Sequence, residues 1–387
     1  LLYDGNKEKI FPFSSNDYFP DELIRYLHVT TSDSHKNSWL GFNGLGGIKV
    51  ISPKKFGLFK RPVNSTLPYS LAAGDNGNIY VGIYLSDIEV YDKDGDYIKT
   101  LKLPDEDKKY GSPRAMAMID STTLIVKSVI NELYAININN GQRKILSQFL
   151  PRHIDSLLGD FESGMQRIKD GEVWLSYRNR VLSLQKTKNG FETKPVCTLP
   201  VNERINSMYY ETNGRLWFCT LGSVWYFEKT IFKKISLPVS YYKHINKHPD
   251  GKIWVTSTDG VYILKDTQLV KRLNTKDGLP NSFVYSVLFD DDGNSWVSTN
   301  RGLAKIDSLY HITTYSAKEG LQGDEFNTRC YSKGPDGTLY FAGVNGINFF
   351  KPKRLISKTE ASNTMLTNIE VNNQPYLPGL QPEYFSI

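Results

Sequence analysis

A hairpin sequence that recurs along the chain constrains the fold more than any other feature. In its clearest copy an apolar run over residues 284–289 ends at Asp292-Gly293, and a return run begins at Trp296. Asp-Gly favours a reversal because Gly readily adopts positive φ. Aromatic and β-branched residues in the return run suit a pleated surface. A second turn at residues 300–302 leads into a third run, so the pattern predicts an antiparallel meander.

The hairpin recurs at a regular period. A glycine followed three residues later by Trp or Tyr occurs at Gly77, Gly171, Gly214, Gly251, Gly293 and Gly337, with degenerate copies at residues 35–41 and 120–126. The spacing from the first of these glycines to the last averages about 43 residues per unit, which is typical of a four-stranded propeller blade. The sequence therefore predicts an all-β protein, a β-propeller of seven or eight four-stranded blades.

The tryptophans of the repeat share one position in it. A residue at a fixed place in every unit is expected to pack between neighbouring blades, whereas aromatic residues that stack on sugars would stand at irregular loop positions. The residues concerned are Trp39, Trp174, Trp217, Trp254 and Trp296.

Closure of the ring needs one more strand than the repeats supply. The last unit, which ends near Pro352, lacks a fourth strand, and an open sheet edge exposes unpaired backbone groups. Lys9–Phe13 has strand composition and is unassigned. We predict that it completes the last blade, the alternative being that it belongs to an earlier domain. The first unit, residues 18–62, is either an eighth blade or part of a preceding propeller.

Composition excludes several classes. No apolar run approaches the 18 or so residues of a membrane helix, and a net charge of +6 without a basic run argues against nucleic-acid binding. The three cysteines predict no disulfide framework. His244 and His248 lie four apart, but on a strand this spacing does not put them on one face, so no metal and no cofactor are expected. The chain begins at Leu1 without a signal segment, which we interpret as a fragment.

The repeats resemble a known family. The D-G-x-x-W-x-x-T-x-x-G-L pattern, Gly278-Leu279-Pro280-Asn281 and the E-G-L-Q-x-x-E-F-N segment at residues 319–327 resemble two-component regulator propeller repeats. These form the sensor region of hybrid two-component systems in polysaccharide-degrading gut Bacteroidetes. Residues 365–373 resemble the first strand of the family's tyrosine-motif β-sandwich. The resemblance implies a propeller over residues 1–352, followed at 353–387 by a linker and the first sandwich strands.

That resemblance also implies a function. It predicts a periplasmic domain of an inner-membrane sensor, anchored through segments absent here, which binds an oligosaccharide and relays to a histidine kinase. The implied partners are this glycan, the other domains of the sensor and a second copy in a homodimer. The fragment itself is predicted to be no enzyme, since no G-x-S-x-G elbow or phosphate loop occurs. The alternatives are a sialidase-like or lyase-like glycan-active propeller enzyme, or a purely protein-docking propeller.

Candidate ligand residues come from one face. A propeller presents its second-to-third-strand loops on the same face as its blade-to-blade entries. Amides suit sugar hydroxyls, and Arg pairs with uronate or sulfate; the alternative is that these are ordinary turn residues. A ligand near the junction with the sandwich is expected to bind this fragment weakly or not at all. The predicted site residues are Arg178, Arg180, Asn300, Arg301, Asn327, Arg329 and Asn345.

Overall fold

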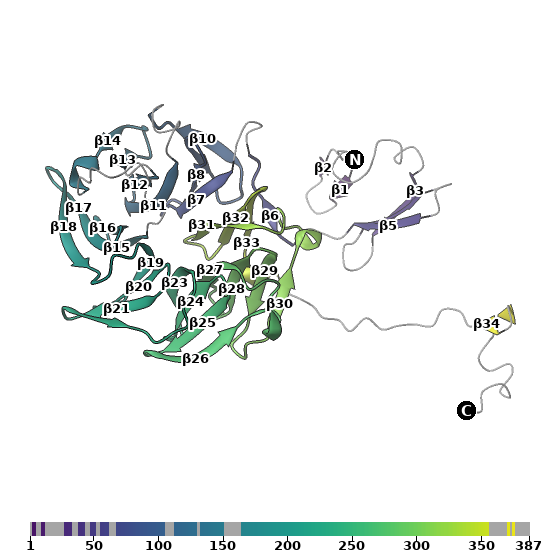
Figure 1. The fold of residues 1–387 in the computed structure, drawn as a ribbon. Coiled ribbons are helices and arrows are strands. Elements are labelled where there is room, and N and C mark those ends of the chain that lie inside the picture. The colour runs from purple at the N-terminus through teal and green to yellow at the C-terminus, as the bar shows by residue number, and fades with distance from the viewer. Residues whose placement is uncertain are drawn as a thin grey trace.

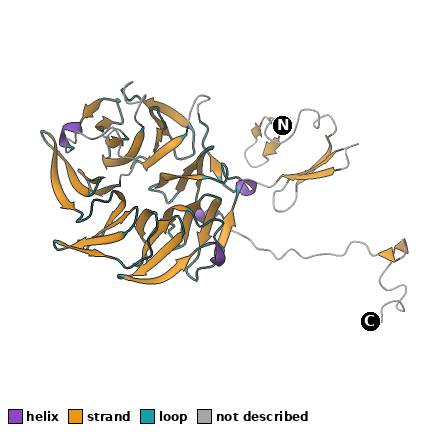
Figure 2. Ribbon diagram, viewed as in Figure 1, coloured by secondary structure: helices purple, strands orange, loops and turns teal. Residues whose placement is uncertain are grey.

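The structure is a computed structural model that describes residues 55–61, 67–104, 112–129, 132–150 and 164–355. It also gives the backbone of seven short strands outside these ranges, β1 to β5, β34 and β35. Within the described ranges the only helices are single 3₁₀ turns, at Ser147–Phe149, Thr275–Asp277, Ala317–Glu319 and Pro352–Arg354 (Figure 2). None of the described helices is long and apolar enough to cross a membrane. The three cysteines are free.

Seven four-stranded antiparallel sheets follow one another around a ring (Figure 1). The first strands of successive blades contact each other, and β31 contacts β7, so they line the axis and the ring closes. Blade 1 contains β7 (Pro68–Ala73), β8 (Ile79–Ile83), β9 (Ile88–Tyr91) and β10 (Tyr97–Leu101), and blade 2 contains β11 (Pro113–Asp120), β12 (Thr123–Ser128), β13 (Leu133–Asn137) and β14 (Arg143–Ile145). Blade 3 contains β15 (Met165–Lys169), β16 (Glu172–Tyr177), β17 (Arg180–Thr187) and β18 (Gly190–Thr198), and blade 4 contains β19 (Ile205–Tyr210), β20 (Leu216–Thr220), β21 (Val224–Glu228) and β22 (Ile231–Lys234). Blade 5 contains β23 (Tyr242–Lys247), β24 (Ile253–Ser257), β25 (Gly260–Lys265) and β26 (Gln268–Leu273), and blade 6 contains β27 (Val284–Phe289), β28 (Ser295–Thr299), β29 (Gly302–Ile306) and β30 (Ile312–Tyr315).

Blade 7 is assembled from two distant parts of the chain. It contains β31 (Phe326–Lys333), β32 (Leu339–Gly343) and β33 (Gly346–Phe350), and its fourth strand is β6 (Gly57–Leu58). Phe349 pairs with Gly57 and Asn348 with Leu58. The prediction that Lys9–Phe13 closes the ring is therefore wrong, because β2 (Lys9–Phe11) pairs with β1 (Leu2–Asp4) instead.

Two aromatic anchors explain why the later segment is the closing one. Phe56 is buried between Tyr315 and Phe350, with ring centroids 5.2 and 5.0 Å away. Phe59 is buried on the other side of the blade, 4.7 Å from Tyr91 and 5.9 Å from Tyr340. The segment thus fills the interfaces of blade 7 with both neighbours as well as its open edge, and burying such aromatic rings is strongly favourable.

The first repeat unit adds no blade to this ring. Its strands β3 (Leu27–Ser32), β4 (Ser38–Phe42) and β5 (Gly47–Ile51) form a separate three-stranded sheet. Of the two predicted blade numbers, seven is confirmed. Past Leu355 the described backbone is limited to β34 (Glu370–Val371) paired with β35 (Gln374–Pro375). The division into 1–352 and 353–387, and the sandwich itself, remain predictions.

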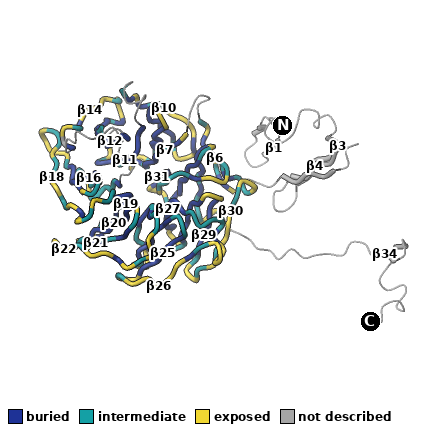
Figure 3. Tube along the Cα trace, in the orientation of Figure 1, coloured by how far each residue is buried: buried dark blue, intermediate teal, exposed yellow. Residues whose placement is uncertain are grey.

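The hydrophobic core lies between the blades. In Figure 3 buried residues follow the inner strands of the ring, and exposed residues are concentrated on the outer strands and turns. Each of the seven interfaces holds one cluster of buried apolar side chains drawn from both neighbours. Trp217, Trp254 and Trp296 are buried in the interface with the following blade, and the partly buried Trp174 packs at the corresponding place. The predicted packing role is confirmed for these four; the side chain of Trp39 lies outside the described residues.

Candidate functional site

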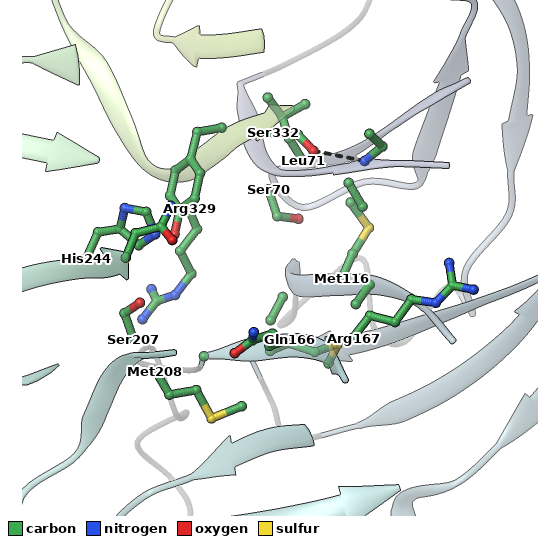
Figure 4. A pocket seen from close by; sticks show the side chains of 18 of the residues that line it. Ser70, Leu71, Met116, Gln166, Arg167, Ser207, Met208, His244, Arg329 and Ser332 are labelled. Atoms are coloured by element: carbon green, nitrogen blue, oxygen red, sulfur yellow. Dashed lines mark hydrogen bonds between the residues drawn. The ribbon is translucent and has the colours of Figure 1, made fainter. Parts of the chain in front are cut away.

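A cavity of about 450 Å³ lies on the ring axis. All seven inner strands contribute to its lining, which is mostly polar or small, and Figure 4 shows side chains converging on it from several blades. The strands run from the blade-to-blade entry face, where β31 contributes Arg329, to the Asp-Gly hairpin face, where it contributes Lys333. A polar hollow made by all seven blades is the feature most suited to binding a small molecule.

Arg329 reaches the cavity from a break in the pairing of β31. Phe326 pairs with Gly343 and Tyr331 with Phe341, so five steps along β31 match two along β32. Within this bulge Arg329 has φ 62°, a left-handed conformation that is uncommon for a bulky side chain. The side chain is buried, and its Nη2 donates to the backbone oxygen of Asn206 at 3.0 Å. The bulge redirects this side chain toward the axis.

Asn206, on β19, is 1% exposed and lines the same cavity. Its Nδ2 donates to the backbone oxygen of Tyr242 at 2.6 Å, which orients the amide. Its Oδ1 has no hydrogen-bond partner within the described part of the chain. Buried acceptors are nearly always satisfied, and leaving one unsatisfied costs free energy. Asn206 is therefore a lining residue that holds a buried acceptor without a donor from the described chain.

His244, on β23, is buried beside Arg329. Its Nδ1 accepts the backbone N–H of Val287 at 3.1 Å, and its ring lies 4.3 Å from that of Tyr331. Burial, with a smaller contribution from the positive charge of Arg329, lowers the pKa of His244 to about 3. The imidazole is neutral at physiological pH, and a base this weak is poorly suited to proton abstraction there.

Ion pairs border the hairpin end of the cavity. Arg167 Nη1 lies 2.7 Å from a carboxylate oxygen of Asp75, joining blade 3 to blade 1. Lys333 Nζ lies 2.8 Å from Asp291 Oδ1 and also donates to the backbone oxygen of Phe289. These partly exposed pairs contribute little stability individually, but they give this end of the cavity a defined charged border.

The seven predicted site residues do not form one site. Arg178 lies in the β16–β17 turn of blade 3 and Arg180 is the first residue of β17, while Asn300 and Arg301 form the β28–β29 turn of blade 6. Blades 4 and 5 come between these pairs along the ring. Asn327 donates to the backbone oxygen of Pro68, a contact between blades 7 and 1. Only Arg329 lines the axial cavity.

A second hollow, of about 610 Å³, lies on the entry face between blades 6 and 7. Arg301 lines it together with Pro280, Lys318 and Asp324. The exposed Asn345 stands in the neighbouring β32–β33 turn, where its backbone N–H donates to Gln322 Oε1 at 2.7 Å. The structure therefore brings Arg301 and blade 7 together, and this hollow is the second candidate site.

The arrangement of the described side chains does not indicate a metal site. Among the described residues no group of three or more His, Cys, Asp or Glu side chains could hold a metal ion. The cavity offers guanidinium, amide, hydroxyl and neutral imidazole groups, which are suited to hydrogen bonding and to pairing with an anion.

Comparison with known protein families identifies the type of repeat. Residues 278–301, which include the blade 6 hairpin, match the model of the family described as "Two component regulator propeller". The chain carries a two-component regulator propeller repeat. The predicted recognition of these repeats is confirmed, and the six remaining blades repeat the same four-stranded unit around the axis.

The proteins that match the chain are longer than it is. Histidine kinase P4 of Formosa agariphila is 23% identical over 301 residues, 72% of this chain and 20% of the relative. The extracellular domain of a putative hybrid two-component system from B. thetaiotaomicron superposes with a TM-score of 0.69 at 20% identity, covering 90% of this chain and 49% of the other. The chain thus spans about a fifth of the first and about half of the second.

An enzyme shares the propeller fold as well. Virginiamycin B lyase from Staphylococcus aureus, in a catalytically inactive form with quinupristin, superposes with a TM-score of 0.62 at 16% identity. The match covers 77% of this chain and 99% of the lyase. At these identities the likeness establishes the fold alone.

Arg114, Asn206 and His244 line the cavity, but the sequence analysis did not predict them as site residues. A repeated signal marks the first two: the second residue of the inner strand is bulged out of the ladder in blades 1, 2, 4, 5 and 6. Aligning the repeats at this position selects Arg114 and Asn206, together with Tyr69, Lys243 and Tyr285, which do not line the cavity. His244 follows that position by one residue and carries no separate signal.

Proposed function

We propose that this chain is the extracytoplasmic, periplasmic sensor propeller of a hybrid two-component protein and binds an oligosaccharide without changing it. The observation that carries this proposal is the axial cavity, which is polar and to which all seven blades contribute. Its hydroxyl, amide and guanidinium groups match the hydrogen-bonding demands of a sugar. The sensors that share the repeat and the fold support the two-component setting.

Binding without chemistry is supported by the imidazole nearest the cavity. His244 has its Nδ1 engaged by a backbone N–H and remains neutral far below physiological pH, since its pKa is lowered to about 3. It is therefore a poor general base. The lyases of the same fold make a glycan lyase the second candidate, and formation of product is the measurement that separates the two.

Blade 7 is suited to relay the signal. Its inner strand β31 lines the cavity with Arg329 and Tyr331, and its outer strand β6 is the segment through which the chain enters the ring. Leu355, where the described chain leaves the ring, packs against the apolar cluster between blades 6 and 7. If β31 can adopt two positions and the ligand binds one of them more tightly, binding would favour that position. The shift would be passed to β6, where the chain enters the ring, and to Leu355, where it leaves. In the complete protein these would connect to the membrane anchor, the histidine kinase and a second subunit.

The residues predicted on the entry face keep a place in this proposal. Arg301, with Asn300 and Asn345 nearby, borders the hollow between blades 6 and 7, near the point where the predicted sandwich would follow. Arg178 and Arg180, on blade 3, would belong to a separate contact on that face. The axial cavity and the entry-face hollow are distinguished by alanine substitution at Arg329 and at Arg301.

The test is to incubate the chain with pools of defined oligosaccharides and to measure both its melting temperature and the release of product. A rise in melting temperature without product is the expected result. Product formation would favour the lyase. The absence of a shift with every pool would overturn glycan sensing by this chain and leave the protein-docking propeller.

A further inference from the structure

We propose that the axial cavity selects an acidic sugar, with Arg329 pairing with a carboxylate or sulfate group and Asn206 Oδ1 accepting a hydroxyl of the same ligand. This inference rests on the proposed function and adds the chemical class of the ligand. It depends on two independent observations, the strained placement of Arg329 and the unsatisfied acceptor of Asn206.

The first observation is that the chain accepts backbone strain to put a cation on the axis. Arg329 adopts φ 62° inside a bulge that no other inner strand shares in this form, and its side chain is buried. Gly would adopt this backbone conformation without cost, whereas an arginine there costs free energy. Such strain is concentrated at functional sites. In Figure 4 the Arg329 side chain runs from its strand past His244 and ends beside Ser207.

The charge of the described lining residues favours an anion. Its cationic side chains are Arg114, Arg167, Arg329 and Lys333, against the single carboxylate of Asp75. Arg167 is paired with Asp75, and Lys333 with Asp291, both at the hairpin end. Arg114 and Arg329 lie at the entry end and are only 8% and 9% exposed. His244, which stays neutral, adds no charge between them.

The second observation defines the other half of the ligand. The Nδ2 of Asn206 is held by the Tyr242 carbonyl, so its Oδ1 can only accept, and the described chain offers it no donor. The Arg329 Nη2 contact to the backbone oxygen of Asn206 places the two residues side by side. Oδ1 is buried just beneath the cavity surface, so a ligand reaches it after a small movement of the lining side chains. A ligand that uses both groups carries an anionic oxygen for the guanidinium and, within a few ångströms of it, a hydroxyl donor. Uronic acids and sulfated sugars combine these groups.

Size and geometry agree with this ligand class. The cavity volume of about 450 Å³ falls within the range of about 300–1,000 Å³ typical of small-molecule sites. Arginine binds carboxylate and sulfate oxygens through two parallel N–H groups, which a lysine cannot reproduce.

The experiment is calorimetric titration of the 387-residue chain with two matched pairs of probes. Digalacturonate is compared with its methyl ester, and N-acetylglucosamine 6-sulfate with N-acetylglucosamine. We expect one acidic probe to bind at least about tenfold more tightly than its neutral partner, and the pair in which this occurs identifies carboxylate or sulfate. Equal binding within both pairs would overturn the acidic class while leaving glycan sensing intact. Binding of none of the four probes would overturn it as well, and the pools of neutral glycans then decide the proposed function separately.

Three variants locate the site. Arg329→Gln removes the charge, and Asn206→Asp keeps the shape but adds a like charge beside the ligand anion; each is expected to weaken acidic-probe binding at least about tenfold. Arg329→Lys keeps the charge without the planar fork and should give an intermediate loss. Arg143→Gln, on the exposed outer strand of blade 2, is the matched control and should bind as the parent does. Undiminished binding by both Arg329→Gln and Asn206→Asp, with melting temperatures near that of the parent, would place the ligand elsewhere.

Discussion

The indole Nε1 of Trp296 donates a hydrogen bond to Oδ2 of Asp290, 2.9 Å away across the blade 6 hairpin. The other carboxylate oxygen of Asp290 accepts the backbone N–H groups of Asp292 and Asn294, so one side chain both shapes the turn and satisfies a buried indole. Glu211, also six residues earlier, accepts the indole N–H of Trp217 in blade 4, while the backbone N–H of Arg215 in that turn donates to Asn213 Oδ1. In blades 4 and 6 the residue that begins the turn and the tryptophan are therefore linked through a carboxylate.

Blades that have tyrosine in place of tryptophan carry a different residue at the start of the turn. Gly74 precedes Tyr80, and Gly334 precedes Tyr340, by the same six residues. A Cβ at Gly74 would lie 2.9 Å from the Tyr80 ring, and one at Gly334 would lie 3.2 Å from the Tyr340 ring. In these two blades the tyrosine ring lies close to the turn backbone and leaves little room for a side chain there. The turn before each of these tyrosines therefore begins with a glycine, where blades 4 and 6 have an acid.

Asp290→Ala should destabilise the protein by about 2–3 kcal/mol, because it leaves the fully buried Trp296 N–H and two turn amides without their acceptor. Asp292→Ala removes an exposed carboxylate from the same turn and should cost less than about 0.5 kcal/mol. Chemical denaturation of both variants gives the comparison. Equal losses would show that the indole contact contributes nothing beyond the turn.

Blade 5 provides a contrast among the tryptophans. His248 stands where Asp290 stands in blade 6, and the buried Nε1 of Trp254 has no partner within the described residues. Trp254→Phe removes an unsatisfied donor, whereas Trp296→Phe removes a buried hydrogen bond to Asp290 Oδ2, which then keeps only the side-chain amide of Asn294 as a donor. We expect the second substitution to reduce the free energy of unfolding by about 1–2 kcal/mol more than the first. Equal losses in denaturant titrations would indicate that the Trp254 N–H is in fact satisfied.

Ring closure can be tested by paired truncations. A chain that begins at Lys55 keeps β6 and both aromatic anchors, and it should unfold as the 387-residue chain does. A chain that begins at Leu67 loses the fourth strand of blade 7 together with Phe56 and Phe59, and it should fail to fold or melt far lower, since one edge and two interfaces are exposed. Phe59→Ala in the longer chain should cost about 3–5 kcal/mol.

Circular dichroism melts of the two truncated chains measure this difference. If the chain from Lys55 melted as low as the chain from Leu67, residues upstream of the ring would contribute to closure after all.

The sequence specifies the repeat well because each blade satisfies its own local rules. The turn residues, the alternation along the strands and the repeat period can all be recognised in the sequence, and together they predict four-stranded blades with tryptophans between them. The closing strand was missed because Gly57–Leu58 is only two residues long. Its selection depends on Phe56 and Phe59 fitting against residues such as Tyr315 and Tyr340, about 260 to 280 positions later in the chain. No local pattern carries that information.

The site residues were harder to predict from the sequence than the fold, for a related reason. Turn residues such as Arg178 and Arg301 stand out in the sequence, whereas Asn206 and Arg114 look like ordinary strand residues. Their position on the axis follows from bulges that shift the alternation of the inner strands. Arg329 was predicted, but for a place on the entry face rather than in the cavity.

His244 should make stability depend on pH. Because its pKa is lowered to about 3 in the folded protein, against about 6.5 in the unfolded chain, only the unfolded chain takes up this proton between those values. The free energy of unfolding should therefore fall as the pH drops below 6.5, by about 1.4 kcal/mol per pH unit from this group, and be unaffected by it above pH 7. Denaturation at pH 7 and pH 5 should show a smaller loss for His244→Gln than for the parent or for His311→Gln, an exposed histidine. Parallel curves for all three would contradict a buried neutral His244.

The strained backbone at Arg329 predicts that asparagine is more stable there than valine, the reverse of the order at an ordinary strand position. Asn is tolerated in the left-handed region, whereas a β-branched residue is not, so Arg329→Val should be less stable than Arg329→Asn by about 1 kcal/mol or more. An ordinary buried strand position would favour valine instead. Both variants lack the guanidinium and should lose acidic-probe binding equally. Melting temperatures and calorimetry on the pair therefore separate the backbone cost from the ligand contact. If valine were the more stable, the bulge would relax once arginine is removed, and the left-handed conformation would be a consequence of the side chain's own contacts.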